Sequence, residues 1–171
     1  SEEEEIKKVL DEWRRRTEEL RKDLDRVLEE DRRSVEEVKR RLDKVNEELR
    51  RRIDELNLPE EEVRRLRDTL KKDHDRIREE IKRSRDNTRR LREEVEREVK
   101  KSRDRLEELR KRVTDVERAK EEIKKVIKED EDLVRRVRKY IEENSDELRR
   151  LVEEARKNNT RIAKEAEDTS R

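Results

Sequence analysis

The fold class is decided by residues 35–49, which read Val-Glu-Glu-Val-Lys-Arg-Arg-Leu-Asp-Lys-Val-Asn-Glu-Glu-Leu. Apolar residues recur there every three or four positions, and most of the residues between them are charged. Because an α-helix has about 3.6 residues per turn, this spacing places the apolar side chains in one stripe. Glu, Lys and Arg also favour helix and pair across one turn. The stretch therefore predicts an amphipathic helix.

The same stripe extends through the N-terminal third of the chain. Its members are Ile6, Val9, Trp13, Leu20, Leu24, Val27, Val35, Val38, Leu42, Val45, Leu49, Ile53 and Leu56. Doubled positions such as Val9-Leu10 make it wider than a two-stranded coiled-coil seam. High charge with few aromatic residues is also typical of disordered chains, but the regular spacing favours helices. We predict an all-α fold, an elongated antiparallel helical bundle with coiled-coil-like packing.

Composition narrows the function classes. The 171 residues include 54 Lys or Arg and 53 Asp or Glu, and this balance argues against a binder of polyanions. Only 26% of the residues are hydrophobic, which suits a thin apolar seam and not a broad core. No apolar stretch approaches the roughly 20 residues that cross a bilayer, and without Cys there is no disulfide or thiolate metal site.

Two short segments interrupt the helical pattern. In Asn57-Leu58-Pro59, an Asn that tolerates the left-handed conformation precedes a Pro suited to the first turn of a helix. In Asn144-Ser145-Asp146, a similar Asn precedes a Ser or Asp that can cap a helix. These breaks predict three helices, at about residues 2–57, 59–143 and 146–169.

The middle helix is predicted to be very long. After Pro59 the segment has no Gly or Pro, and its apolar stripe stays in phase from Val63 to Ile141. Its average step is about 3.55 residues, close to the coiled-coil value of about 3.5. A rival break is Thr114-Asp115-Val116-Glu117, which matches a capping box. It offers an alternative, a monomeric bundle hinged near Thr114.

Antiparallel hairpins at the two turns predict which residues face each other. Across the first turn, paired residue numbers should add to about 117, so that Asp43-Lys44 faces Asp73-His74 and Ser34 faces Ser84. Across the second, the sum should be about 289, which places Asn158 and Asn159 opposite Asp130.

Polar residues interrupt the apolar stripe at several of these positions. Buried polar groups cost stability unless they are paired, but paired groups can fix register and partner number. We therefore interpret a set of them as polar specificity layers. The set is Thr17, Asp31, Ser34, Asn46, His74, Ser84, Asn87, Thr88, Ser102 and Asn158.

The width of the stripe also predicts self-association. A rod only two helices thick does not cover the doubled stripe positions, whereas two copies side by side give a four-helix cross-section. We expect a homodimer whose single elongated domain covers residues 1–171.

No pattern in the chain predicts chemistry. His74 has no second His at ligand spacing, and without Gly there is no phosphate-binding loop. The many carboxylates lie on solvated helix faces, which supply no cleft for acid–base catalysis. We therefore expect no catalytic, cofactor-binding or metal site, and no nucleic-acid, membrane or small-molecule partner.

Taken together, these residues resemble computationally designed helical bundles and coiled coils with buried hydrogen-bond networks. The likeness rests on the Glu/Lys/Arg surface, the Ile/Leu/Val stripe, the short Asn-containing turns and the Ser/Thr/Asn layers. It implies a self-associating structural scaffold with no natural ligand. From the lack of a bilayer-spanning apolar stretch we expect a soluble chain, cytoplasmic if expressed in a bacterial host. The alternative within this class is one component of a designed heteromeric assembly or a helical binding module.

Overall fold

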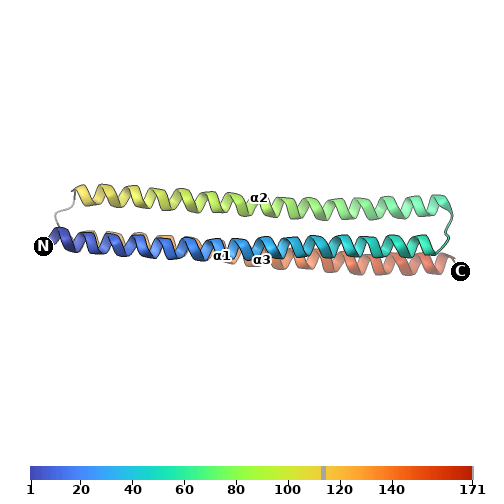
Figure 1. The fold of residues 1–171 in the computed structure, drawn as a ribbon. Coiled ribbons are helices and arrows are strands. Elements are labelled where there is room, and N and C mark those ends of the chain that lie inside the picture. The colour runs from blue at the N-terminus through green and yellow to red at the C-terminus, as the bar shows by residue number, and fades with distance from the viewer. Residues whose placement is uncertain (113–114, 171) are drawn as a thin grey trace. The chain divides into compact units, whose positions relative to one another are not determined.

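Three helices make up the chain in a computed structural model, which describes residues 1–112 and 115–170 (Figure 1). Helix α1 spans Glu2–Glu55, α2 spans Glu60–Arg112 and α3 spans Val116–Ser170. No strand occurs among these described residues, so the predicted all-α helical bundle is confirmed.

The first turn lies where the sequence predicts it. Helix α1 ends at Glu55, and Asn57 has a φ of 51°, the left-handed conformation that Asn tolerates better than most residues. The carbonyl oxygen of Pro59 accepts the first helical hydrogen bond of α2, from the Val63 N–H at 3.0 Å. Three acids in the first turn of α2, Glu60–Glu62, complement the positive end of its dipole.

The predicted helix over 59–143 is wrong, because α2 ends at Arg112 and α3 begins at Val116. The three helices therefore have similar lengths of 54, 53 and 55 residues. Asp115 caps α3: its carboxylate accepts a hydrogen bond from the Glu117 N–H at 3.1 Å, and its carbonyl oxygen accepts one from the Ala119 N–H at 3.1 Å. An Asp cap needs no Gly. The predicted hinge residue, Thr114, lies outside the described residues.

The predicted turn at Asn144-Ser145, and with it the helix at 146–169, is also wrong. Both residues lie inside α3, whose apolar stripe continues from Ile141 to Leu148. Ser and Asn are weak helix formers because their side chains compete for local backbone groups. Here the two side chains bond to other helices instead, so the helix is not interrupted.

Two compact units are built from the three helices. Unit 1 contains Ser1–Glu30 and Asn87–Ile141, and unit 2 contains Asp31–Asp86 and Glu142–Arg171. Each unit thus holds one segment of every helix. The single domain predicted over 1–171 stays a prediction, since it concerns how the two units join.

Within each unit, α1 and α2 run antiparallel in the predicted register. In unit 1 Arg14 contacts Glu107 at 3.1 Å, and in unit 2 Arg85 contacts Glu36 at 2.8 Å and His74 contacts Asp43 at 2.9 Å. These pairs have residue numbers that add to about 117 to 121, which confirms the predicted sum for this hairpin.

Helix α3 runs parallel to α1 in each unit. Contacts in unit 2 join residues 114 or 115 positions apart, such as Ser145 with Asp31 and Arg52 with Glu167. Unit 1 follows the same offset, with Arg16 contacting Glu131 at 3.8 Å. The predicted second sum of about 289 is therefore wrong, because it assumed a turn at Asn144.

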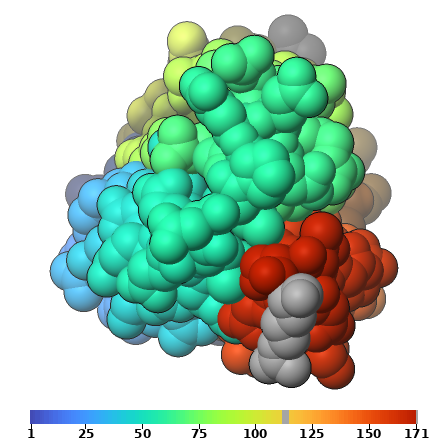
Figure 2. Space-filling view, turned by 90° about the vertical axis from the view of Figure 1, so that its right-hand side faces the viewer, coloured from blue at the N-terminus to red at the C-terminus, as the bar shows by residue number. Residues whose placement is uncertain are grey.

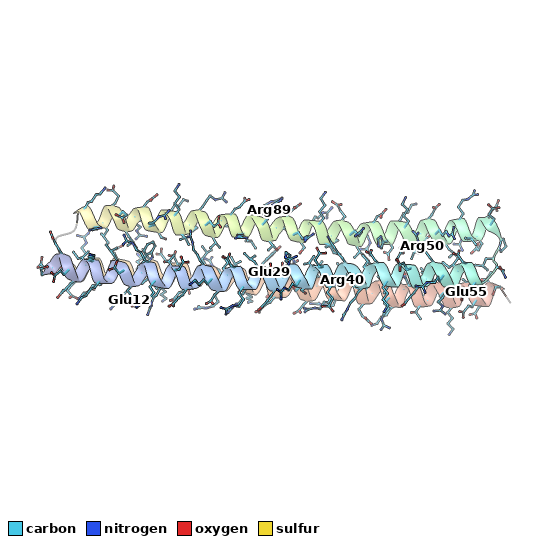
Figure 3. The ribbon with its side chains drawn as sticks, in the orientation of Figure 1. Glu12, Glu29, Arg40, Arg50, Glu55 and Arg89 are labelled. Atoms are coloured by element: carbon cyan, nitrogen blue, oxygen red, sulfur yellow. The ribbon has the colours of Figure 1, made fainter. Side chains whose placement is uncertain are left out.

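The apolar stripes of the three helices bury one another inside each unit. In unit 2, Ile53, Ile77 and Ile81 are almost wholly buried, and α3 contributes the small side chains Ala155, Ala163 and Ala166. Figure 2 views the end of unit 2 at which the three helix ends pack against one another. Charged residues extend outward from the helices, as the labelled side chains in Figure 3 show. One large hydrophobic side chain among the described residues is exposed, Tyr140.

This burial removes the reason for expecting a homodimer. The expectation assumed that a single chain leaves its wide stripe uncovered. In unit 1, Ile6, Leu10 and Trp13 of α1 pack with Leu106 of α2 and Ile123 of α3, and all five are buried within one chain. The homodimer itself stays a prediction.

Candidate functional site

Polar side chains inside the helical core are the candidate functional residues of this protein. Each one costs free energy on burial unless it finds a hydrogen-bond partner. Those buried among the described residues are Thr17, Asp31, Ser84, Thr88, Asp130, Ser145 and Asn159.

One polar layer in unit 2 joins all three helices. The Ser145 hydroxyl of α3 donates to Oδ1 of Asp31 on α1 at 3.0 Å. Its neighbour Asn144 donates through Nδ2 to the Ser84 hydroxyl oxygen on α2. Successive residues of one helix point in directions about 100° apart, so Asn144 and Ser145 reach two different helices. The segment predicted as a turn is therefore the centre of this layer.

Burial raises the pKa of Asp31 above its ordinary range, because water no longer solvates the charged carboxylate. The hydrogen bond from Ser145 and the positive charge of Arg85 both lower this pKa and offset part of the shift. The Arg85 guanidinium also donates to Glu36 at 2.8 Å. Asp31 is thus a buried carboxylate with a hydroxyl donor and a nearby cation.

A second polar layer, in unit 1, contains Asp130 of α3, Ser102 of α2 and Trp13 of α1. Ser102 donates its hydroxyl to Oδ1 of Asp130 at 3.0 Å. The other carboxylate oxygen, Oδ2, and the indole Nε1 of Trp13 are both buried, and neither has a partner of hydrogen-bond geometry. Asp130 is 5% exposed and Trp13 is 3% exposed. We call this cluster the Asp130 junction.

Burial also raises the pKa of Asp130. The hydrogen bond from Ser102 lowers it, as does the indole N–H of Trp13, which lies close enough to interact with the carboxylate. The negative charges of Glu129 and Glu98 raise it further. Unlike Asp31, Asp130 has no cation among the groups that shift its pKa.

A weaker polar contact lies further along unit 2. The Asn159 amide of α3 donates to the carbonyl oxygen of Val45 on α1 at 3.5 Å, which is longer than the usual range of about 2.7 to 3.2 Å. The adjacent Asn46 has a buried Oδ1 without a partner. This position is therefore less well satisfied than the Asp31 layer.

The predicted contact between Asp43 and His74 is confirmed. His74 Nε2 lies 2.9 Å from Asp43 Oδ1, and the histidine side chain is 15% exposed. The predicted facing of Ser34 and Ser84 stays a prediction, and Ser34 itself contacts α3. It accepts a hydrogen bond from Arg149 of α3 at 3.1 Å, because the parallel offset brings these two residues together.

Of the ten residues predicted as polar layers, four are buried and four are partly buried. The buried ones are Thr17, Asp31, Ser84 and Thr88, and the partly buried ones are Ser34, Asn46, His74 and Ser102. Asn87 and Asn158 are exposed, so their predicted place in the core is wrong. Each stands one residue before a buried polar residue, Thr88 or Asn159, so its own side chain points about 100° away from the buried face.

The predicted polar layers do not include Asp130, Asn144 or Ser145. The sequence does carry a signal for two of them. Asp130 lies four residues after Val126 and Ser145 lies four residues after Ile141, so both continue the apolar stripe. Their partners on the other helices depend on where the chain turns between α2 and α3. The prediction places this turn at Asn144, so it pairs α3 with the wrong residues.

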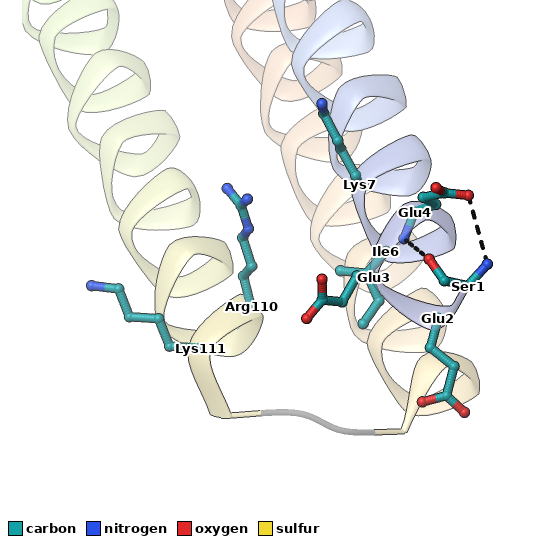
Figure 4. A pocket seen from close by; sticks show the side chains of 8 residues that line it. All are labelled: Ser1, Glu2, Glu3, Glu4, Ile6, Lys7, Arg110 and Lys111. Atoms are coloured by element: carbon teal, nitrogen blue, oxygen red, sulfur yellow. Dashed lines mark hydrogen bonds and ion pairs between the residues drawn. The ribbon is translucent and has the colours of Figure 1, made fainter.

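A hollow of about 600 Å³ lies in unit 1, between the start of α1 and the end of α2 (Figure 4). Ser1 caps α1 there: its hydroxyl oxygen accepts the Glu4 N–H at 3.4 Å and its ammonium contacts the Glu4 carboxylate at 3.6 Å. The lining residues are Ser1, Glu2, Glu3, Glu4, Ile6, Lys7, Arg110 and Lys111. Exposed charges of both signs make up most of this lining, and they do not form a preorganised site.

Other sites were sought along the described ranges 1–112 and 115–170. No group of three or more His, Cys, Asp or Glu side chains in these ranges is arranged to hold a metal ion. None of the helices, as far as they are described, has the length and apolarity that crossing a membrane requires. Comparison with protein-family models, with curated proteins and with solved structures gave no match to this chain.

Proposed function

We propose that this chain is a structural scaffold of the designed-bundle kind, which folds as a monomer and has no catalytic activity. Its role is to hold three helices in a defined register. The observation that carries the proposal is that the apolar stripes of α1, α2 and α3 are buried against each other within one chain. This favours the monomeric alternative over the homodimer.

The polar layers support a structural role. In unit 2, Asp31, Ser84, Asn144 and Ser145 are bonded across three helices, and a slip of one residue along any helix would separate a buried carboxylate from its donor. Buried polar groups of this kind are known to specify register at a cost in stability. In unit 1, the bond between Ser102 and Asp130 acts on α2 and α3 in the same way.

The placement of the carboxylates argues against catalysis. General acid–base work needs a carboxylate with a shifted pKa that a substrate can reach. Asp31 and Asp130 have raised pKa values, but they are 7% and 5% exposed and lie between helices. A substrate would have to separate the helices to reach either group.

The mass of the chain in solution tests the proposal. Size-exclusion chromatography with light scattering, over micromolar to millimolar concentrations, should give the monomer mass of 21.4 kDa throughout, with high helicity by circular dichroism. As a matched control, Ile81→Asp places a charge at a wholly buried position. It should unfold the chain, with loss of helicity, while the mass measured by light scattering stays that of the monomer. A helical species of twice the monomer mass would instead support the homodimer, and a poorly helical chain would support one component of a heteromeric assembly.

A further inference from the structure

The Asp130 junction brings together side chains from all three helices of unit 1. Ser102 satisfies one carboxylate oxygen of Asp130. The second oxygen is buried without a partner, and the buried indole N–H of Trp13 is also without one. A buried ionised carboxylate with one donor is costly, because its remaining lone pairs have lost their water.

Charged groups around Asp130 do not neutralise it. From α2 it faces Glu98, and on α3 it neighbours Glu129, both of the same sign. The cations nearby are engaged with other acids. Arg16 of α1 contacts Glu131 at 3.8 Å and Glu12 at 3.6 Å.

An α2 cation that reaches Glu129, the neighbour of Asp130, is engaged in the same way. Arg105 contacts Glu122 at 2.9 Å and Glu129 at 3.7 Å. From α1 the group that faces Asp130 is the uncharged indole of Trp13. Asp130 therefore has a donor, an aromatic neighbour and two acids around it, and no ion-pair partner among the described residues.

We propose that the Asp130 junction is a proton switch of unit 1, in which uptake of one proton by Asp130 strengthens the packing of the three helix segments. The proton comes from solvent and forms an O–H bond on one carboxylate oxygen; no other bond forms or breaks. The neutral carboxyl group donates this hydrogen to the Ser102 oxygen, while the carboxyl group stays beside the indole of Trp13. The buried charge, which desolvation and the acids Glu98 and Glu129 disfavour, is then gone.

The direction of the response follows from the environment of Asp130. Burial raises the pKa of Asp130 in the folded state above its unfolded value. Between these two values the folded state binds more protons than the unfolded state, so stability falls as pH rises through this window. Unit 1 is therefore more stable with Asp130 protonated, and loses stability on the way to neutral pH.

Trp13 makes the switch directly observable, because it is the one Trp in the sequence. Its fluorescence, followed from pH 8 to pH 3, should show a one-proton transition centred above the ordinary Asp value of about 3.9. The variant Asp130→Asn should lose this transition. The matched control Asp31→Asn, which removes the other buried carboxylate, should keep it, because Asp31 belongs to unit 2.

A further variant tests the direction of the effect. Ser102→Ala removes the hydrogen bond that lowers the pKa of Asp130, so the transition should move to higher pH. Carboxyl-carbon NMR of Asp130 in the unmodified chain gives the same titration directly, and covers the case in which Asp130→Asn fails to fold. A carboxyl that titrates at or below about 3.9, or a fluorescence transition that persists unchanged in Asp130→Asn, would overturn the proposal.

Discussion

The hydrogen bond between Ser145 and Asp31 allows a quantitative test of the polar layer in unit 2. The substitution Ser145→Ala removes the hydroxyl donor to Oδ1 of a carboxylate that is 7% exposed. Hydrogen bonds to charged groups contribute about 1.5 to 3 kcal/mol. The higher helix propensity of Ala inside α3 offsets about 0.5 kcal/mol of this loss. We therefore expect the free energy of unfolding at pH 7 to fall by about 1 to 2.5 kcal/mol.

The pH dependence of this loss has a definite sign. Because the bond from Ser145 lowers the pKa of Asp31, its removal raises that pKa further above the unfolded value. The penalty is therefore largest where Asp31 is ionised, near neutral pH, and shrinks as pH falls and Asp31 takes up a proton. Urea unfolding followed by circular dichroism at several pH values between 4 and 7 measures both the size and the trend.

A double-mutant cycle isolates the pair from other effects. Asp31→Asn, Ser145→Ala and the double variant should show a coupling free energy of about 1 kcal/mol or more at pH 7. Ser34→Ala is the matched control, since Ser34 bonds to the exposed Arg149, and it should change stability by less than about 0.5 kcal/mol. A coupling below about 0.3 kcal/mol, or a penalty that grows as the pH is lowered, would refute the reasoning.

Three further substitutions test the packing and the helix ends. Ile81→Ala empties a wholly buried position in unit 2 and should lower the free energy of unfolding by about 2 to 5 kcal/mol in urea titrations, whereas Ile81→Val should cost only about 0.5 to 1.5 kcal/mol. Asp115→Ala removes the N-cap of α3 and should cost about 0.5 to 2 kcal/mol by the same measurement; equal stability would show that the cap is dispensable. Asn57→Gly keeps the left-handed φ accessible and should be neutral or slightly stabilising in thermal unfolding, while Asn57→Val should lower the melting temperature.

The sequence predicts the helices better than it predicts their ends. The first turn is predictable because Pro59 lacks an N–H and Asn57 tolerates a left-handed φ, and both backbone properties mark a helix boundary. The second turn carries no such residue. Its cap, Asp115, is one of many acids in a chain where cap-like motifs such as Ser34-Val35-Glu36-Glu37 occur inside helices. The stripe also stays in phase across it, and phase does not distinguish one long helix from two.

Because the sequence predicts the first turn and not the second, it predicts contacts between α1 and α2 better than contacts with α3. The contact between Asp43 and His74 follows from the first turn alone, so it was predicted correctly. The stripe predicts Asp31 and Ser102 as core polar residues, but their partners, Ser145 and Asp130, lie on α3. Asn144 and Ser145 have the composition of a turn, and only the neighbouring helices show that their side chains bond elsewhere.

The alanines of α3 have a consequence for local opening of unit 2. A buried Leu or Ile side chain contributes about 1.5 to 3 kcal/mol and an Ala much less, so the end of α3 near Ala163 and Ala166 is held by less apolar area than the α1 segment near Leu49 and Ile53. Backbone amides in that part of α3 should therefore exchange with deuterium before those of the opposing α1 segment, through fluctuations that leave the rest of the unit folded.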